Sequence, residues 1–274
     1  MTYYTEKGAP IFHTARQIAF TSLDKTLSQL YGNTEITEMS FRDVWLSNME
    51  KEGDIIPDGW YCPPPRGTAV LGNERVKFDS LRNDYNWSGE TRIDWKGVLY
   101  AYASPVDLTD GRIGDISVTL YFGEDQKVVD HIRNCFEATV EVFERLGEAS
   151  CAGDVFWISQ EIFRNHQLKS LVISRTDDMP INLGHTFPAL SVLPKEKVLS
   201  EQERMEISTS RKFLNGSADW NFEDGLQFTV EPQLVSMVDE SLPKITQHYL
   251  VKAAENDFIV CNDIDSLLKK YGSI

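Results

Sequence analysis

The sequence has little positive charge and no long apolar run. It carries 27 Lys and Arg residues against 42 Asp and Glu residues, which gives a formal net charge of −15. An acidic surface repels nucleic acids and anionic membranes, so we expect neither as a partner. No apolar stretch reaches the roughly 18 residues of a transmembrane helix. The N-terminus also lacks the basic and apolar regions of a secretory leader.

Cysteines are few and scattered. Cys62, Cys135, Cys151 and Cys261 show no CxxC spacing, so the sequence predicts neither a disulfide framework nor a zinc site. Reduced thiols without a leader are typical of a cytoplasmic protein, and we expect that location. The sequence also lacks a glycine-rich phosphate loop and a nucleophile elbow, which argues against phosphate binding and serine-nucleophile chemistry.

The sequence does contain enough apolar residues for a core, since 41% of its 274 residues are hydrophobic. Apolar residues at helical or alternating spacing predict six helices and six strands. The expected helices cover 10–30, 40–49 (with Ser40 as N-cap), 127–146, 154–163, 200–213 and 263–271; the expected strands cover 68–71, 98–103, 116–122, 168–174, 226–230 and 245–251.

The order of these elements repeats along the chain. Two helices followed by strands occur before residue 122 and again after it. This pattern predicts one α/β (α+β) domain over 1–274, with helices covering one face of a curved, mostly antiparallel, pseudo-twofold sheet. A pocket in the concavity of that sheet would bring Asp115, His185 and Glu231 together.

His185 and Glu231 are the first candidates for chemistry. His185 follows Gly184 in Asn-Leu-Gly-His-Thr-Phe-Pro, which we interpret as a polar loop after a strand. Glu231 ends the alternating run Leu-Gln-Phe-Thr-Val and precedes Pro232, so its carboxylate is expected at the end of a strand. Alone, each residue is more often structural or solvated than catalytic.

Four segments resemble the pita-bread family of methionine aminopeptidase, aminopeptidase P, prolidase and creatinase. They are Gly114-Asp115-Ile-Ser-Val-Thr119, Asn182-Leu-Gly-His185, Phe228-Thr-Val-Glu231-Pro232 and the closing strand region 245–256. Their order and approximate spacing agree with the family over almost the whole chain. The resemblance implies the pita-bread fold.

The resemblance also implies a pair of divalent ions held by two Asp, one His and two Glu. Asp115, His185 and Glu231 match three of these positions. The first aspartate position falls on Ser104 or Ala103, and the last glutamate position falls on Gln247, next to His248. Because these replacements remove two anionic ligands, we expect no tightly bound pair of metals.

Three functions remain open. The first is a creatinase- or aminopeptidase-like enzyme that hydrolyses or eliminates at a C–N bond of a small molecule, in specialised metabolism, without a dinuclear site and with no cofactor. The second is a non-catalytic binding or scaffold protein. The third, weaker hypothesis is a hydrolase or aminopeptidase with one weakly bound divalent ion on Asp115, His185 and Glu231.

Under the first hypothesis the catalytic residues are His185, Glu231 and Asp115. The segment around Trp60, Tyr61 and Arg66 is expected to form a wall of the substrate pocket. Gln247 and His248 are expected to contact the substrate as well. The expected partner is a small-molecule substrate, and a homodimer remains open.

Overall fold

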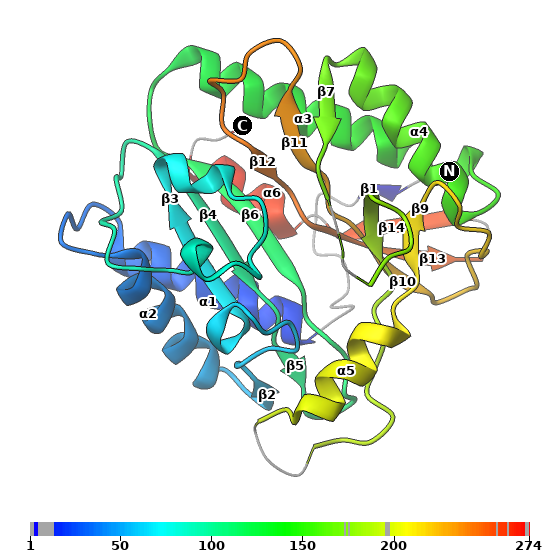
Figure 1. Ribbon diagram of the computed structural model, residues 1–274, viewed down its shortest axis with the longest axis horizontal. Helices are drawn as coiled ribbons and strands as arrows, with labels where there is room; N and C mark the ends of the chain where they lie inside the picture. Colours follow the sequence, from blue (N-terminus) through cyan, green and yellow to red (C-terminus); the bar gives the residue numbers. More distant parts are fainter. Residues whose placement is uncertain are drawn as a thin grey trace.

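The computed structural model describes residues 3–4, 14–172, 174, 176–194, 198–255, 257–261, 263–271 and 274. All six predicted helices are present in it (Figure 1). The start of the first one, before residue 14, lies outside the described residues. The helices are α1 (Thr14–Leu30), α2 (Glu38–Glu50), α3 (Gln126–Glu144), α4 (Ala152–Asn165), α5 (Glu201–Ser210) and α6 (Asp263–Lys270).

The start of α2 differs from the prediction. Its N-cap is Thr37, whereas Ser40 is the third residue of the helix. The Thr37 side chain accepts a hydrogen bond from the Ser40 N–H, and the Ser40 hydroxyl accepts one from the Thr37 N–H. Both residues are good capping types, and this reciprocal box satisfies two free backbone donors at once.

The first half of the chain forms an antiparallel sheet with strand order β3-β4-β6. Its strands are β3 (Thr68–Gly72), β4 (Val98–Ala103) and β6 (Ile116–Tyr121), and nearly every residue in them is buried. The short strands β2 (Ile55–Ile56) and β5 (Val106–Asp107) pair beside it. Helices α1 and α2 pack together, and Trp45 of α2 donates a hydrogen bond to the Ala19 carbonyl of α1 at 2.9 Å.

The second half repeats this plan with α3 and α4 in place of α1 and α2. Its largest sheet has the order β1-β14-β13-β10, in which only β1 (Tyr3–Tyr4) is parallel to its neighbour. The other strands of that sheet are β10 (Gln227–Val230), β13 (Tyr249–Ala254) and β14 (Asp257–Cys261). Two small sheets complete this half, one of β7 (Leu168–Ser170), β11 (Gln233–Ser236) and β12 (Ile245–Thr246), the other of β8 (Asn182–His185) and β9 (Phe213–Asn215).

Two predicted segments differ from the structure around the candidate residues. His185 is the last residue of β8 and not part of a loop. The predicted strand 245–251 is interrupted at Gln247 and His248, because β12 pairs with β11 whereas β13 pairs with β10. At the interruption the chain pairs instead with β6 of the first half, through a bridge between Val118 and Gln247 and a hydrogen bond from His248 N–H to the Ser117 carbonyl.

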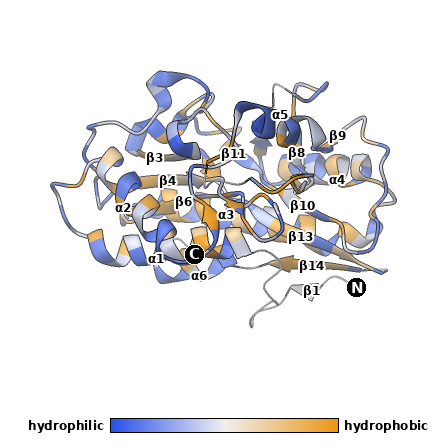
Figure 2. Ribbon diagram, turned by 90° about the horizontal axis from the view of Figure 1, so that it is seen from below, coloured by the Kyte–Doolittle hydropathy of each residue, from blue (hydrophilic) through white to orange (hydrophobic). Residues whose placement is uncertain are grey.

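The two halves share one hydrophobic core, which includes Trp45 and Val118 from the first half and Phe143 and Tyr249 from the second. Helices α1 and α6 lie on one side of the strands and α5 on the other (Figure 2). The structure is therefore an α/β fold with helices and mostly antiparallel sheets, as predicted, but the strands form several sheets and α5 does not share the face that α1 and α6 cover. None of the described helices combines the length and apolar character needed to cross a bilayer.

Candidate active site

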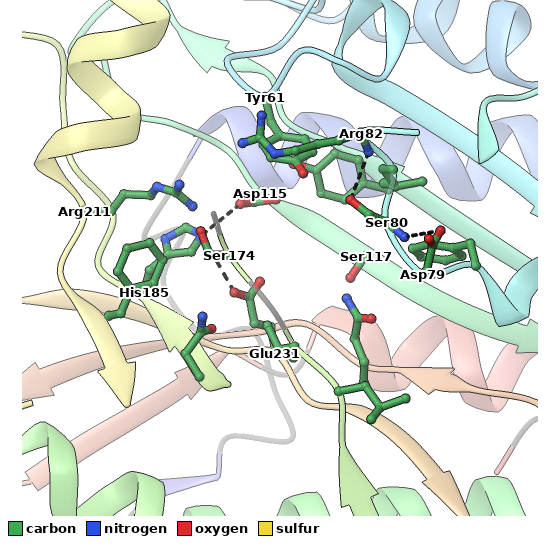
Figure 3. Close-up of a pocket in the computed structure, with 18 of the residues that line it drawn as sticks. Tyr61, Asp79, Ser80, Arg82, Asp115, Ser117, Ser174, His185, Arg211 and Glu231 are labelled. Atoms are coloured by element: carbon green, nitrogen blue, oxygen red, sulfur yellow. Dashed lines mark hydrogen bonds and ion pairs between the residues drawn. The ribbon is translucent and has the colours of Figure 1, made fainter. Parts of the chain in front are cut away.

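Three strand ends deliver the three predicted acid–base residues to one cavity. Asp115 directly precedes β6, His185 ends β8 and Glu231 directly follows β10. All three line a cavity of about 100 Å³, and Figure 3 shows their side chains turned toward one another. The structure thus brings together residues that are 70 and 46 positions apart in sequence.

Close packing of β8 against β10 fixes His185 and Glu231. Gly184 has a φ of +154°, and a Cβ there would lie 2.2 Å from the Thr229 carbonyl oxygen, so no larger residue fits without rearrangement. The His185 N–H donates to the Thr229 hydroxyl at 2.8 Å, and the Glu231 N–H donates to the Leu183 carbonyl at 2.8 Å. The glycine before His185 is therefore required by a close approach of two backbones.

The imidazole of His185 faces both carboxylates. Its Nε2 lies 3.4 Å from Oδ2 of Asp115 and 3.8 Å from Oε1 of Glu231. Its Nδ1 lies 2.9 Å from the Thr186 carbonyl oxygen, which can only accept. The Nδ1 nitrogen therefore carries a proton, and in the neutral ring the Nε2 lone pair faces the two carboxyl groups.

His248 contacts the same two carboxyl groups but does not line the cavity. Its Nε2 lies 3.1 Å from Oε2 of Glu231, and its Nδ1 lies 3.9 Å from Oδ1 of Asp115. The residue is only 1% exposed. The two carboxyl groups thus lie between two imidazoles, one on the cavity side and one on the buried side.

The environment gives the two carboxyl groups opposite pKa shifts. Burial and the charge of Asp115 raise the pKa of Glu231 well above its usual value. Burial would also raise the pKa of Asp115, but His248, His185 and Arg211 around it hold it below its usual value. At neutral pH Asp115 is therefore ionised, whereas its surroundings favour the protonated form of Glu231. Two neighbouring carboxyl groups with separated pKa values are typical of acid–base sites.

Both imidazoles are neutral at the same pH. Burial, together with the nearby positive charge of Arg211, lowers the pKa of His185. Burial lowers the pKa of His248 to about 3. The site therefore holds a proton donor in Glu231 and a proton acceptor in His185 at 3.8 Å from each other.

Sequence reasoning missed two arginines that line the cavity. Arg211 follows α5, and its guanidinium lies 4.7 Å from the ring centre of Trp60 and 5.0 Å from that of Phe213. Arg82 lies 4.8 Å from the ring centre of Tyr61. No ion pair of either guanidinium with a carboxylate of the described residues is present within 4.0 Å. Nothing in the sequence around them distinguishes them from surface arginines.

The structure places some of the residues predicted to contact the substrate in the cavity wall and others outside it. Trp60 and Tyr61 line the cavity. The Trp60 and His185 rings pack edge to face, with their centres 5.9 Å apart. Arg66 does not line it, because its guanidinium pairs with Asp58 and Glu50 near the surface. Gln247 and His248 are both 1% exposed and lie outside the cavity lining.

The positions that the resemblance assigns to metal ligands can be compared with the donors present. The Ser104 hydroxyl donates to the Gly67 carbonyl at 3.1 Å and accepts from the Tyr61 N–H at 3.2 Å, so it is engaged in the loop before β3. Gln247 offers only a neutral amide. Within the described ranges, the group of side chains able to hold one ion is Asp115, Glu231 and His248, with His248 in place of the His185 inferred from sequence. This donor set fits one ion, and the expectation that no pair binds stays a prediction.

No protein-family model and no curated protein sequence matches this chain. Its structure is similar to those of several peptidases. The X-Pro aminopeptidase from Thermotoga maritima has a TM-score of 0.60 at 16% identity, over 90% of this chain and 58% of that one. The prolidase from Pyrococcus furiosus has a TM-score of 0.60 at 16% identity, over 93% of this chain and 63% of that one. The methionine aminopeptidase from Rickettsia prowazekii has a TM-score of 0.57 at 14% identity, over 95% of this chain and 99% of that one.

The chain spans less than two thirds of the length of the first two of these peptidases and nearly the full length of the third. The similar structures include prolidases, an X-Pro aminopeptidase, dipeptidases and a methionine aminopeptidase, and the match extends over both halves of this chain. At these low identities the similarity establishes the architecture. The chain therefore has the pita-bread fold, as a sequence-divergent example of it.

Proposed function

We propose that the chain is a hydrolase that cleaves a C–N bond of a small substrate by proton transfer through His185 and Glu231. The observation that carries this proposal is the convergence in one cavity of a carboxyl group with a raised pKa, a carboxyl group with a lowered pKa and an imidazole with a lowered pKa. A site with a separate proton donor and acceptor suits reactions in which one group loses a proton while another gains one.

The geometry supports the following proton transfers. His185 Nε2 accepts a proton from the water that attacks the substrate carbon, and Asp115 at 3.4 Å stabilises the imidazolium. Glu231 donates its proton to the leaving nitrogen as the C–N bond breaks. The proton on His185 then returns to Glu231, 3.8 Å away, and restores the starting state. In an elimination, the same two residues would remove a proton from carbon and protonate the leaving nitrogen.

The cavity favours a small substrate with an anionic group. Among the described residues, Asp115 is the carboxylate that acts most strongly on Arg211, which is 8% exposed and lies against Trp60 and Phe213. Arg82 adds a second guanidinium to the same lining. Guanidinium groups bind carboxylates through paired hydrogen bonds, so we propose a carboxylate on the substrate near Arg211.

The test is turnover of small amide- or amidine-containing carboxylates, followed by mass spectrometry with and without a chelator. Each carboxylate is paired with its neutral primary amide, which keeps the shape and removes the charge. We expect turnover of carboxylates that is lost in His185→Ala and in Glu231→Gln. Arg66→Gln is the matched control, because Arg66 lies outside the cavity and pairs with Asp58 and Glu50. Turnover that persists in His185→Ala would contradict the proposal.

A second candidate is a single-metal hydrolase, which the grouping of Asp115, Glu231 and His248 favours. A divalent ion bound there would polarise the scissile group or lower the pKa of a bound water. Turnover abolished by the chelator and restored by one ion would select this candidate. If no small carboxylate or amide is turned over, the non-catalytic binding protein becomes the better description.

A further inference from the structure

The wall of the cavity contains polar atoms without hydrogen-bond partners. Among the described residues that line it, these atoms are Nε1 of Trp60, Oδ1 of Asp115, Nε of Arg211, and both Nδ2 and Oδ1 of Asn182. A buried polar atom left unpaired costs free energy, so such atoms in a cavity wall are typical of a site that a ligand completes. Asn182 differs from the others, because its donor and its acceptor are both without a partner.

The backbone holds Asn182 on the same wall as the proton-transfer residues. Asn182 begins β8, the strand that His185 ends, and its N–H donates to the Val172 carbonyl at 3.1 Å. The carbonyl of the next residue, Leu183, accepts the hydrogen bond from the Glu231 N–H at 2.8 Å. Asn182 itself is 1% exposed and lines the cavity together with His185 and Glu231.

A carboxamide with both polar atoms unpaired selects a narrow class of ligand group. Nδ2 donates and Oδ1 accepts, so the partner must present an acceptor and an N–H donor on one edge. Rotating the carboxamide so that the two atoms exchange places leaves this requirement unchanged. A carboxylate offers only acceptors, and an ammonium group offers only donors. A trans peptide group has its C=O and N–H on opposite sides, whereas a primary amide has both on one edge.

Arg211 and Trp60 provide a second polar point in the same cavity. Nη2 of Arg211 donates to the Thr176 hydroxyl at 3.0 Å, whereas its Nε and the Nε1 of Trp60 have no partner within the described ranges. Figure 3 shows the guanidinium reaching the cavity beside His185. These donors suit the carboxylate proposed above. The cavity, at about 100 Å³, is far smaller than the roughly 300–1,000 Å³ of pockets for drug-sized ligands, so one small molecule fills both points.

We propose that Asn182 is a specificity-determining residue that binds a primary amide of the substrate through two hydrogen bonds. Its Nδ2 donates to the amide oxygen, and its Oδ1 accepts from the amide N–H. This inference deepens the proposed function and rests on its carboxylate site at Arg211. The ligand class is therefore a short carboxylic acid that carries a primary amide, and a trans peptide group does not satisfy Asn182.

The test is binding of matched probes to the full chain, measured by ligand-observed NMR. Succinamate and glutaramate carry a carboxylate and a primary amide. Levulinate and 5-oxohexanoate are their methyl ketones, which keep the length and the carbonyl group but have CH₃ in place of NH₂. We expect each amide to bind about 10-fold more tightly than its methyl ketone, because loss of the N–H leaves a buried acceptor unpaired. N-methylsuccinamate, a trans secondary amide, should bind no more tightly than levulinate.

The variant Asn182→Leu separates recognition from folding. It keeps a similar side-chain size and removes both polar atoms, so the preference for the amide should disappear. The melting temperature should stay the same or rise, because the side chain makes no hydrogen bond to the described residues in the free protein. Asn165→Leu, at an exposed position of α4, is the matched control and should keep the preference.

The outcomes distinguish this inference from the proposed function. Succinamide that binds as tightly as succinamate would contradict the carboxylate site at Arg211, and amide-selective binding without turnover would support Asn182 while counting against the hydrolase. The inference is overturned by methyl ketones that bind as tightly as the amides, by no detectable binding of either amide, or by a preference that persists in Asn182→Leu. A lower melting temperature of Asn182→Leu would also overturn it, because it would assign Asn182 to the support of the fold.

Discussion

Burial suits Glu231 and His185 to the chemical roles proposed for them. Both are common surface residue types, but in this cavity burial raises the pKa of Glu231 and lowers that of His185. Burial thus favours the uncharged form of each side chain, which the proposed roles of proton donor and proton acceptor require. The roles follow from desolvation and neighbouring charge and not from the residue types alone.

Loss of either residue should reduce turnover by about 10²–10⁴-fold, the usual contribution of a positioned acid or base. His185→Ala removes the acceptor. Glu231→Gln keeps the shape of the side chain and removes its proton, so activity should fall more than stability. Steady-state rates and urea unfolding of both variants provide the check, and a variant that loses stability in proportion to its activity would contradict the assigned role.

The pH dependence of turnover should be bell-shaped. Activity should fall at low pH as His185 becomes protonated, and it should fall at high pH as Glu231 loses its proton above its raised pKa. The rate profile of the wild type, measured from acid to alkaline pH at constant ionic strength, reports both limbs. A profile that rises with pH and does not fall again would exclude Glu231 as the acid.

Lys244 provides a prediction about stability. Burial lowers the pKa of this lysine to about 7, although its Nζ donates to the Phe78 carbonyl at 2.7 Å. Between about pH 7 and the unfolded value of roughly 10.4, the unfolded chain binds a proton that the folded chain lacks. Stability should therefore rise with pH in this window, by up to about 1.4 kcal/mol per pH unit.

Urea unfolding at several pH values checks the effect of Lys244. Lys244→Met should lose this pH-dependent gain, whereas Lys25→Met, whose side chain is 43% exposed, should keep it. Equal slopes for the wild type and Lys244→Met would show that Lys244 is charged in the folded state.

Among the elements, the approach of β8 to β10 controls the placement of the site. His185 ends β8 and Glu231 directly follows β10, and the two residues face each other because Gly184 lets the two backbones approach closely. The break between β12 and β13 has a comparable effect, because it places the imidazole of His248 3.1 Å from the Glu231 carboxyl group and 3.9 Å from that of Asp115. Irregularities in the sheets thus create the convergence that regular strands would not.

Gly184→Ala should destabilise the protein and reduce activity together. The new Cβ would lie 2.2 Å from the Thr229 carbonyl oxygen, which is backbone and cannot rotate away, and the φ of +154° adds strain. We expect a loss of about 1–3 kcal/mol, as for other overpacked positions. Gly147→Ala is the matched control, because a Cβ there meets nothing within 4 Å. Thermal unfolding of both variants tests the difference, and equal melting temperatures would be inconsistent with this close contact.

For the molecule as a whole, Arg16 links the two halves at their seam. From α1 it holds the Asp115 carbonyl of the first half and the His248 carbonyl of the second, and it pairs with Asp263 of α6. The pairing of residues 247 and 248 with β6 lies at the same place. The candidate site is therefore built where the halves meet, and its geometry depends on their association.

Arg16→Met should cost about 3–5 kcal/mol of unfolding free energy, as for other buried ion pairs that lose one partner. It leaves two buried carbonyl groups and the Asp263 carboxylate without this partner. Arg92→Met removes a surface pair whose side chains are 65% and 70% exposed, and it should cost less than about 1 kcal/mol. Urea denaturation of both variants measures the two costs, and similar values would contradict the role of Arg16.

The sequence by itself determined the helices, most strands, the pita-bread resemblance and the three residues Asp115, His185 and Glu231. These features depend on local patterns, namely apolar spacing and short motifs with Gly or Pro. Tertiary structure alone decided that His248 faces the two carboxyl groups from outside the cavity, that Arg211 lines the cavity and that Arg66 does not. The physical reason is that a side chain's direction at a strand break or after a helix depends on distant pairing partners, such as Ser117 for His248, and not on its sequence neighbours.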